Sequence, residues 1–203
     1  MPELTTIALF IPTFFLVSIT PGMCMLLALS LGMSIGLRRT LPMMLGELCG
    51  VALVAMAAAF GVAAILLTHP MLFTGLKLIG GAYLIYLGIN SWRSSGGLVQ
   101  TEAVTDVSAK SLAMRGFLTA IANPKGWAFM VALLPPFLNQ SQPLLPQMLG
   151  LLAVIMVCEF ICMSLYASGG SSLRRLLSHN NVQLMNRLSG SIMVFLGIWL
   201  WLG

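Results

Sequence analysis

The stretch that decides the fold is Ala120-Ile121-Ala122-Asn123-Pro124-Lys125-Gly126-Trp127, which lies inside a long apolar run. Pro124 has no backbone N–H and its ring crowds the preceding turn, so a helix over about 116–138 should break just before it. Where the helix restarts, Asn123 is suited to the N-cap and Pro124 to the first position, which leaves free backbone N–H groups at a positive dipole end. With the charge of Lys125 added, this break is predicted to bind an anion.

The composition indicates a polytopic membrane protein. Of 203 residues, 59% are apolar and only 7% are charged, which is far less charge than a soluble domain carries on its surface. A helical span needs about 20 apolar residues, so we expect six spans and no appended soluble domain. We attribute the net charge of +5 to basic cytoplasmic loops, which argues against nucleic acid as a partner.

Six spans are predicted at about 5–33, 41–67, 72–92, 116–138, 146–170 and 182–202. Every second loop between them is basic, through Arg38, Arg39, Arg93, Lys110, Arg115, Arg174 and Arg175. The positive-inside bias then places both termini outside, which is the periplasm if the source is a Gram-negative bacterium. The first span has a longer apolar stretch than a secretory signal and no basic flank, so we expect it to be retained.

The two halves of the chain repeat a pattern. Ser18-Ile19-Thr20-Pro21-Gly22 in the first span corresponds to residues 120–124 in the fourth, and Leu-Pro-x-Met-Leu-Gly opens the second and fifth spans at 41–46 and 145–150. Because three spans are an odd number, the second copy is predicted to sit upside down in the bilayer. Interrupted helices at matching positions of such repeats are a transporter signature that points to a midplane site. Chance similarity among Leu- and Gly-rich helices is the alternative.

The predicted fold is therefore all-α and integral to the membrane, with six transmembrane helices as a 3+3 inverted repeat and broken helices one and four. We expect a single polytopic domain over 1–203. Its first repeat covers about 1–93, a cytoplasmic link about 94–115, and its second repeat about 116–203.

Motifs in the first four spans carry a family resemblance. They are Phe117-Leu118, Asn123-Pro124-Lys125, Phe129 and the Leu-Pro-Pro-Phe of 134–137, together with Pro21-Gly22, the Gly46/Gly50 pair and residues 76–84 running on to Leu87-Gly88. They resemble the LysE/RhtB family of amino-acid exporters over nearly the whole chain. The resemblance implies an inner-membrane exporter of amino acids or close derivatives, driven by the proton gradient. Where that family usually has Pro-Gly-Pro followed by Asn or Asp, this chain has Pro21-Gly22-Met23-Cys24, which leaves the substrate open.

Two half-helix N-termini are predicted to meet near the midplane. Thr20 is expected to cap the helix after the first break, as Asn123 caps the helix after the second, with the following amides facing one cavity. Such an arrangement binds a substrate carboxylate. The predicted substrate-binding residues are Thr20, Pro21, Gly22, Asn123, Pro124 and Lys125. A plain kink is the alternative for Pro21.

Besides Arg187, which lies just inside the sixth span, four charged side chains fall inside the spans. Lys125 lies about 15 Å along a helix from Arg115, too deep for its stem to reach the interface, whereas Lys77 is close enough to the outer edge for snorkelling to compete. Glu47 and Glu159 are expected to be either paired with a base or protonated, and both states suit a proton carrier. The pairs Glu47–Lys77 and Glu159–Lys125 are left open, as is a purely structural role of each Glu in neutralising a Lys.

Two other classes of protein are weighed against an exporter. A membrane thiol-disulfide carrier needs a Cys pair that meets across the site, and Cys24 follows Pro21-Gly22 suggestively, but the matching place in the fourth span holds Gly126-Trp127. A membrane scaffold would not need Glu and Lys inside its spans. The sequence has neither a catalytic set nor metal-ligand spacing, so we predict no enzyme, no cofactor and no metal. We predict a secondary exporter of a small amino acid or related zwitterion in exchange for protons, and leave open whether it is a monomer or a homodimer.

Overall fold

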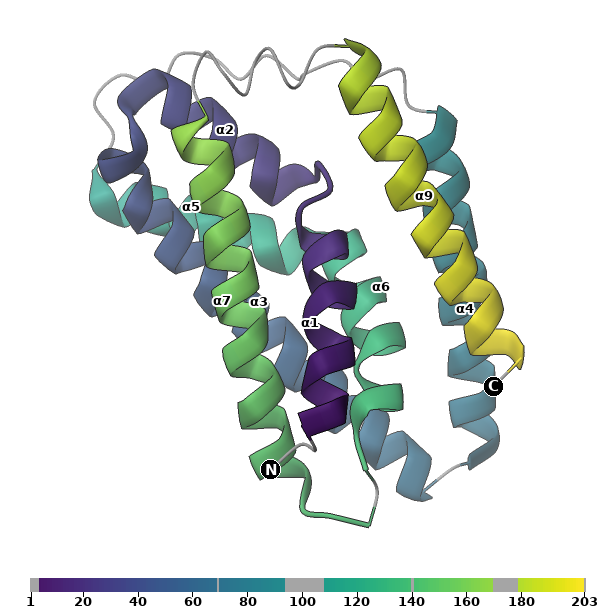
Figure 1. The fold of residues 1–203 in the computed structure, drawn as a ribbon. Helices are drawn as coiled ribbons and strands as arrows, with labels where there is room; N and C mark the ends of the chain where they lie inside the picture. The colour runs from purple at the N-terminus through teal and green to yellow at the C-terminus, as the bar shows by residue number, and fades with distance from the viewer. Residues whose placement is uncertain (1–3, 69, 94–107, 140, 170–178, 203) are drawn as a thin grey trace.

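The computed structural model describes residues 4–68, 70–93, 108–139, 141–169 and 179–202, and this part of the chain is helical without a strand (Figure 1). The elements are α1 (Leu4–Ser18), α2 (Met23–Ile35), α3 (Leu37–Thr68), α4 (Pro70–Arg93), α5 (Ala109–Ala122), α6 (Pro124–Leu133), the 3-10 turn η1 (Pro135–Phe137), α7 (Leu144–Ser168) and α9 (His179–Leu202). The all-helical class predicted from the sequence is confirmed for these residues.

Length and apolar character identify the elements that can cross a membrane. Within the described ranges, two continuous helices are long and apolar enough to cross, Leu37–Gly61 and Leu144–Ser168. Two further pairs are apolar enough together but are bent at a short break: Thr5–Ser18 with Met23–Ile35 by 62°, and Ala109–Ala122 with Pro124–Phe137 by 56°. The predicted breaks in the first and fourth spans are therefore present. Counting each bent pair as one gives up to four candidate spans, and the total of six stays a prediction.

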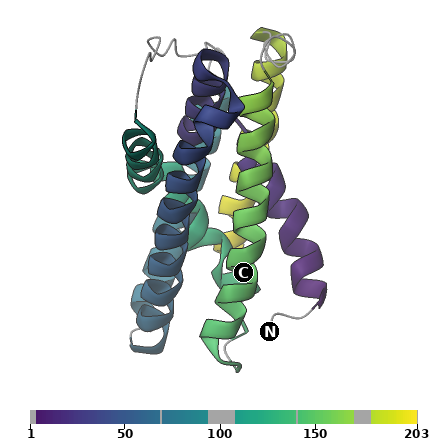
Figure 2. The same ribbon diagram turned by 90° about the vertical axis from the view of Figure 1, so that its left-hand side faces the viewer.

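The long helices α3 and α7 form the frame on which the broken helices pack. Figure 2 shows α3 and α7 running roughly parallel, with α5 seen end-on where it crosses the outer side of α3. One core joins α1, α3, α6 and α7 through residues such as Phe14, Val54, Met130 and Ile155. A second core joins α2, α3, α5 and α7. The halves α1 and α2 pack on α7, and the halves α5 and α6 pack on α3, so close side-chain packing holds each broken helix against a long one.

Glycines allow the helices to cross at backbone distance. A Cβ on Gly46 of α3 would collide with the carbonyl oxygen of Ala113 in α5, and a Cβ on Gly116 would collide with the backbone of α3. The pair α4 and α9 meets in the same way where Gly88 faces the carbonyl of Gly190. Small residues at helix crossings are the usual means of close packing in membranes, where apolar burial between helices supplies little.

Candidate functional site

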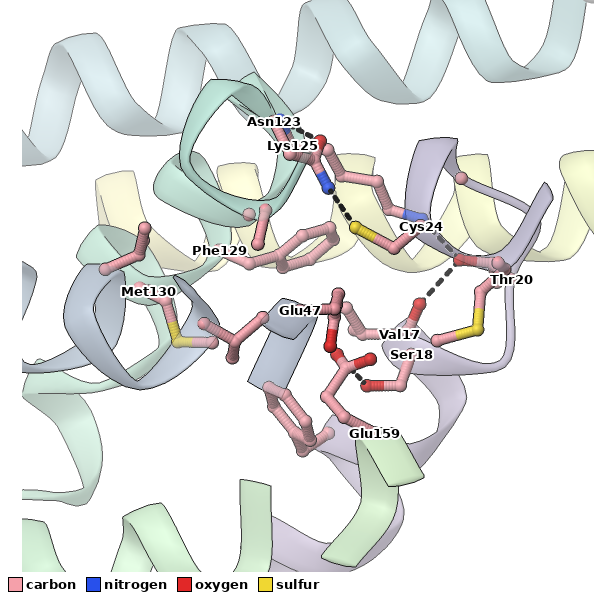
Figure 3. Close-up of a pocket in the computed structure, with 17 residues that line it drawn as sticks. Val17, Ser18, Thr20, Cys24, Glu47, Asn123, Lys125, Phe129, Met130 and Glu159 are labelled. Carbon is pink, nitrogen blue, oxygen red and sulfur yellow. Dashed lines mark hydrogen bonds between the residues drawn. The ribbon is translucent and has the colours of Figure 1, made fainter. Parts of the chain in front are cut away.

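The two helix breaks face one cavity of about 60 Å³ (Figure 3). At about 10–15 Å³ for each water position, it has room for a few water molecules. Its polar lining comes from five helices and from the two breaks, and consists of Ser18, Thr20, Gly22, Cys24, Glu47, Asn123, Lys125 and Glu159. Its apolar lining includes Phe14, Val17, Val51, Val54, Phe129 and Met130. Charged and amide groups from both halves of the chain therefore meet in apolar surroundings.

The second break has the predicted geometry. Asn123 is the N-cap of α6, where its Oδ1 accepts from the backbone N–H of Lys125 at 3.1 Å, and Pro124 occupies the first helical position. The Trp127 indole N–H donates to the carbonyl oxygen of Ile121 at 2.8 Å, which satisfies an acceptor left by the break. Pro124 is exposed and does not line the cavity. It shapes the break rather than the cavity wall.

The first break differs from the prediction in one respect, because Thr20 does not cap α2. The N-cap is Gly22, in extended conformation with φ −142° and ψ 178°, and it makes no side-chain capping bond. Thr20 lies two residues earlier, beside the end of α1, so its hydroxyl donates back to the carbonyl of Val17 at 2.6 Å. The Tyr166 hydroxyl satisfies the carbonyl of Ile19 at 2.8 Å. The amides of the first turn of α2 are consequently left without a side-chain cap.

Lys125 links the two breaks. Its Nζ donates to Thr20 Oγ1 at 2.6 Å and lies 5.8 Å from the centroid of the Phe129 ring. The same Nζ is 3.7 Å from the position that a Cβ on Gly22 would take. A cation carried by α6 is thereby placed at the uncapped N-terminus of α2. Both the charge and the helix dipole make this end of the cavity favourable for an anion.

The two carboxyl groups lie at the other end of the cavity. Glu47 of α3 is only 1% exposed, and its Oε2 has no hydrogen-bond partner. Glu159 of α7 accepts from the Ser18 hydroxyl at 2.8 Å. In the described part of the chain no ion pair within 4.0 Å joins Lys125 to either carboxylate. The side chain of Lys77 lies outside the described residues, so the Glu47–Lys77 pair stays a prediction.

The structure adds residues to the site that were not selected from the sequence. Ser18, Cys24 and Phe129 line the cavity, and Cys24 Sγ accepts from Asn123 Nδ2 at 3.8 Å. Ser18 does belong to the stretch that corresponds between the two halves, which was a usable signal. The sequence marks Cys24 as part of a departure from the family pattern and as a candidate for redox chemistry, but not as a residue that lines the site. Pro21 is partly buried in the break itself and, like Pro124, is not among the lining residues.

Relatives of this chain include membrane proteins and exporters. The family profile described as LysE type translocator matches residues 15–203. A membrane protein of Vibrio cholerae serotype O1 is 32% identical over 184 residues, which is 90% of each chain. The homoserine/homoserine lactone efflux protein of Salmonella typhimurium is 26% identical over 183 residues, 90% of this chain and 89% of its own length. The leucine efflux protein of Salmonella choleraesuis is 31% identical over 101 residues, covering 48% and 47%. No solved structure gives a significant match.

Proposed function

Because the chain belongs to the LysE-type translocator family, we propose that it exports a small amino acid or related zwitterion across the inner membrane in exchange for protons. The efflux proteins among its relatives and its apolar helices support a multi-pass membrane exporter. The observation that carries the proposal is the bond from Lys125 to Thr20, which joins two helix breaks at one buried cavity. A polar site between broken helices is the arrangement that transporters use at membrane depth.

The inverted repeat is part of this proposal. Bends of 62° and 56° fall at corresponding positions of the two halves, as expected for two copies of one three-helix unit within a single domain. Figure 1 shows α1 beginning and α9 ending in the lower half of the view, while α3 begins and α4 ends at the top. Arg38 and Arg39 lie in the first turn of α3 and Arg93 ends α4. Basic residues opposite the termini support a periplasmic location of both ends.

The carboxylate of the substrate is proposed to bind between the N-termini of α2 and α6. The uncapped amides after Gly22 and the positive dipole end at Asn123 would face it, and Lys125 would add a full charge. To bind the substrate, the ammonium of Lys125 would give up its hydrogen bond to Thr20 and donate to an oxygen of the substrate carboxylate instead. A charge-assisted bond is stronger than the bond to a neutral hydroxyl, so the exchange favours the bound substrate.

The cavity must enlarge for transport. Its 60 Å³ is well below the roughly 300–1,000 Å³ of ligand pockets, so it is too small for an amino acid as it stands. Separation of α1 and α2 from α5 and α6 at their breaks would open it to one side or the other. Movement of this kind around a fixed central site is the general basis of alternating access.

Proton coupling is proposed to act through Glu47 and Glu159. Both carboxyl groups line the same cavity as Lys125, so a proton bound there changes the charge that the substrate meets. A proton moving inward through 100 mV releases about 2.3 kcal/mol. That energy is enough to bias which side of the cavity is open.

A transport assay in inside-out vesicles or proteoliposomes tests the function. Labelled leucine and homoserine are supplied with and without a proton gradient, using wild type, Lys125→Ala and the control Lys110→Ala, whose side chain is exposed on α5. We expect gradient-dependent transport in wild type and in Lys110→Ala, and its loss in Lys125→Ala. Undiminished transport by Lys125→Ala would remove Lys125 from the mechanism. Absence of amino-acid transport by wild type would refute the exporter.

A further inference from the structure

Glu47 and Glu159 form a pair of like-charged groups in one small cavity. In Figure 3 their carboxyl groups point toward one another, away from the helix break at Asn123. Glu159 acts on Glu47 electrostatically, and Glu47 Oε2 is buried without any hydrogen-bond partner. Two carboxylates in apolar surroundings repel, and each loses hydration that its neighbours must replace. A positive charge between or beside the two groups would therefore offset both their repulsion and their lost hydration.

The groups that face Glu47 do not supply that charge. They are the Cys24 thiol from α2, Lys125 from α6 and Glu159 from α7. Lys125 acts electrostatically on Glu159, but its ammonium is bound to Thr20 and forms no ion pair with the carboxylate. The Ser18 hydroxyl from α1 donates to Glu159. Among the described side chains, no cation lies within 4.0 Å of either carboxylate. The positive charge that the pair requires must then come from a proton or from a bound ligand.

We propose that the Glu47–Glu159 pair binds the ammonium group of the substrate, and that this ammonium and a proton compete for the pair. The inference rests on the proposed function and adds a second recognition point to it. With its carboxylate at Lys125 and its ammonium at the acidic pair, an α-amino acid spans the cavity from one end to the other. The substrate class is then one with a free ammonium group, which excludes N-acetylated amino acids and 2-hydroxy acids.

Competition explains how export and proton entry are linked. A pair that already holds a proton carries one negative charge instead of two, and its proton occupies the place between the carboxyl groups that the ammonium would take, so the site carries one cation or the other. Substrate leaving on the outer side exposes the pair to protons, and a proton leaving on the inner side exposes it to substrate. Exchange then needs no separate proton path through the rest of the protein.

Counterflow in proteoliposomes without a proton gradient tests the inference, because it measures binding and exchange apart from energy coupling. Labelled leucine and homoserine are the probes, between pH 5.5 and 8.5, with wild type, Glu47→Gln, Glu159→Gln and the control Glu102→Gln in the predicted link between repeats. For wild type we expect the half-saturating concentration to rise toward about tenfold per unit of falling pH. For Glu47→Gln and Glu159→Gln we expect it to rise about 30-fold or more and to depend less steeply on pH, because only one carboxyl group of the pair remains.

A second measurement on wild type avoids variants altogether. Excess unlabelled leucine should inhibit counterflow, whereas the 2-hydroxy acid with the same side chain should not. Equal inhibition by the hydroxy acid overturns the inference. Normal counterflow in both Gln variants, with gradient-driven transport lost, also overturns it but leaves the proposed function standing, since the carboxyl groups would then carry protons alone. Wild type that transports neither probe refutes the proposed function itself.

Discussion

The ammonium of Lys125, in the first turn of α6, donates a 2.6 Å hydrogen bond to the hydroxyl of Thr20, which lies 105 positions earlier in the chain. The same hydroxyl donates to the carbonyl of Val17 at 2.6 Å, so it is used both as donor and as acceptor. The bond joins the ends of two broken helices that sequence proximity could not bring together. In the proposed cycle, it is the contact that a substrate carboxylate replaces.

Replacing Thr20 by Val should destabilise the substrate-free protein. Valine has nearly the same shape but cannot accept from Lys125, and a buried donor without a partner costs about 1–3 kcal/mol, or more when charged. We expect a lower midpoint of thermal unfolding in detergent, without substrate, for Thr20→Val. Thr20→Ser keeps the hydroxyl and serves as the control. Equal midpoints for Val and wild type would show that the bond does not contribute to stability.

Replacing Gly46 by Ala should force α3 and α5 apart. The added Cβ would overlap the carbonyl oxygen of Ala113, and overpacking of this kind costs about 1–3 kcal/mol. Gly61 is the matched control, because it lies on the same helix and a Cβ there meets nothing within 4 Å. We expect Gly46→Ala to lower the thermal midpoint and Gly61→Ala to leave it unchanged or raise it slightly. If Gly61→Ala had a lower thermal midpoint than Gly46→Ala, the close crossing of α3 and α5 at Gly46 would be contradicted.

The sequence could predict the features whose causes are local. Pro124 must end a helix, Asn123 is a preferred cap, and a lysine with such neighbours marks a polar site, so the second break was recognised in detail. Thr20 was assigned the wrong partner because a threonine beside a break can bond forward or backward, and the extended backbone at Gly22 decides between them. The contacts Ser18–Glu159 and Asn123–Cys24 depend on how α1, α2 and α7 pack. Tertiary packing of that kind leaves no local pattern in the sequence.

Occupation of the cavity should slow modification of Cys24. Cys24 lines the cavity, whereas Cys49 lies outside it and is exposed, and Cys158 and Cys162 are buried in packed cores. In a variant that keeps only Cys24, we expect a small thiol reagent to react more slowly when leucine or homoserine is present at saturating concentration. Mass spectrometry of the modified protein measures the rate. Rates that are the same with and without either amino acid would place the substrate elsewhere.

Substitution of Asn123 separates the structural role of this residue from its predicted role in anion binding. Both Asp and Ser can replace Asn as an N-cap, since each offers an oxygen to the backbone N–H of Lys125, whereas Ala removes the cap at a cost of about 0.5–2 kcal/mol. Asp also brings a negative charge to the end of the cavity where the substrate carboxylate is proposed to bind.

The three variants should therefore fall into different groups. We expect Asn123→Ser to keep both thermal stability and transport, Asn123→Ala to lose stability, and Asn123→Asp to stay stable while transport falls at least about tenfold, because two negative groups would share Lys125. Thermal unfolding and gradient-driven uptake of labelled leucine or homoserine, measured on the same preparations, distinguish these outcomes. An Asp variant that transports as well as the Ser variant would mean that no anion approaches Asn123 during transport, and the carboxylate site between α2 and α6 would have to be abandoned.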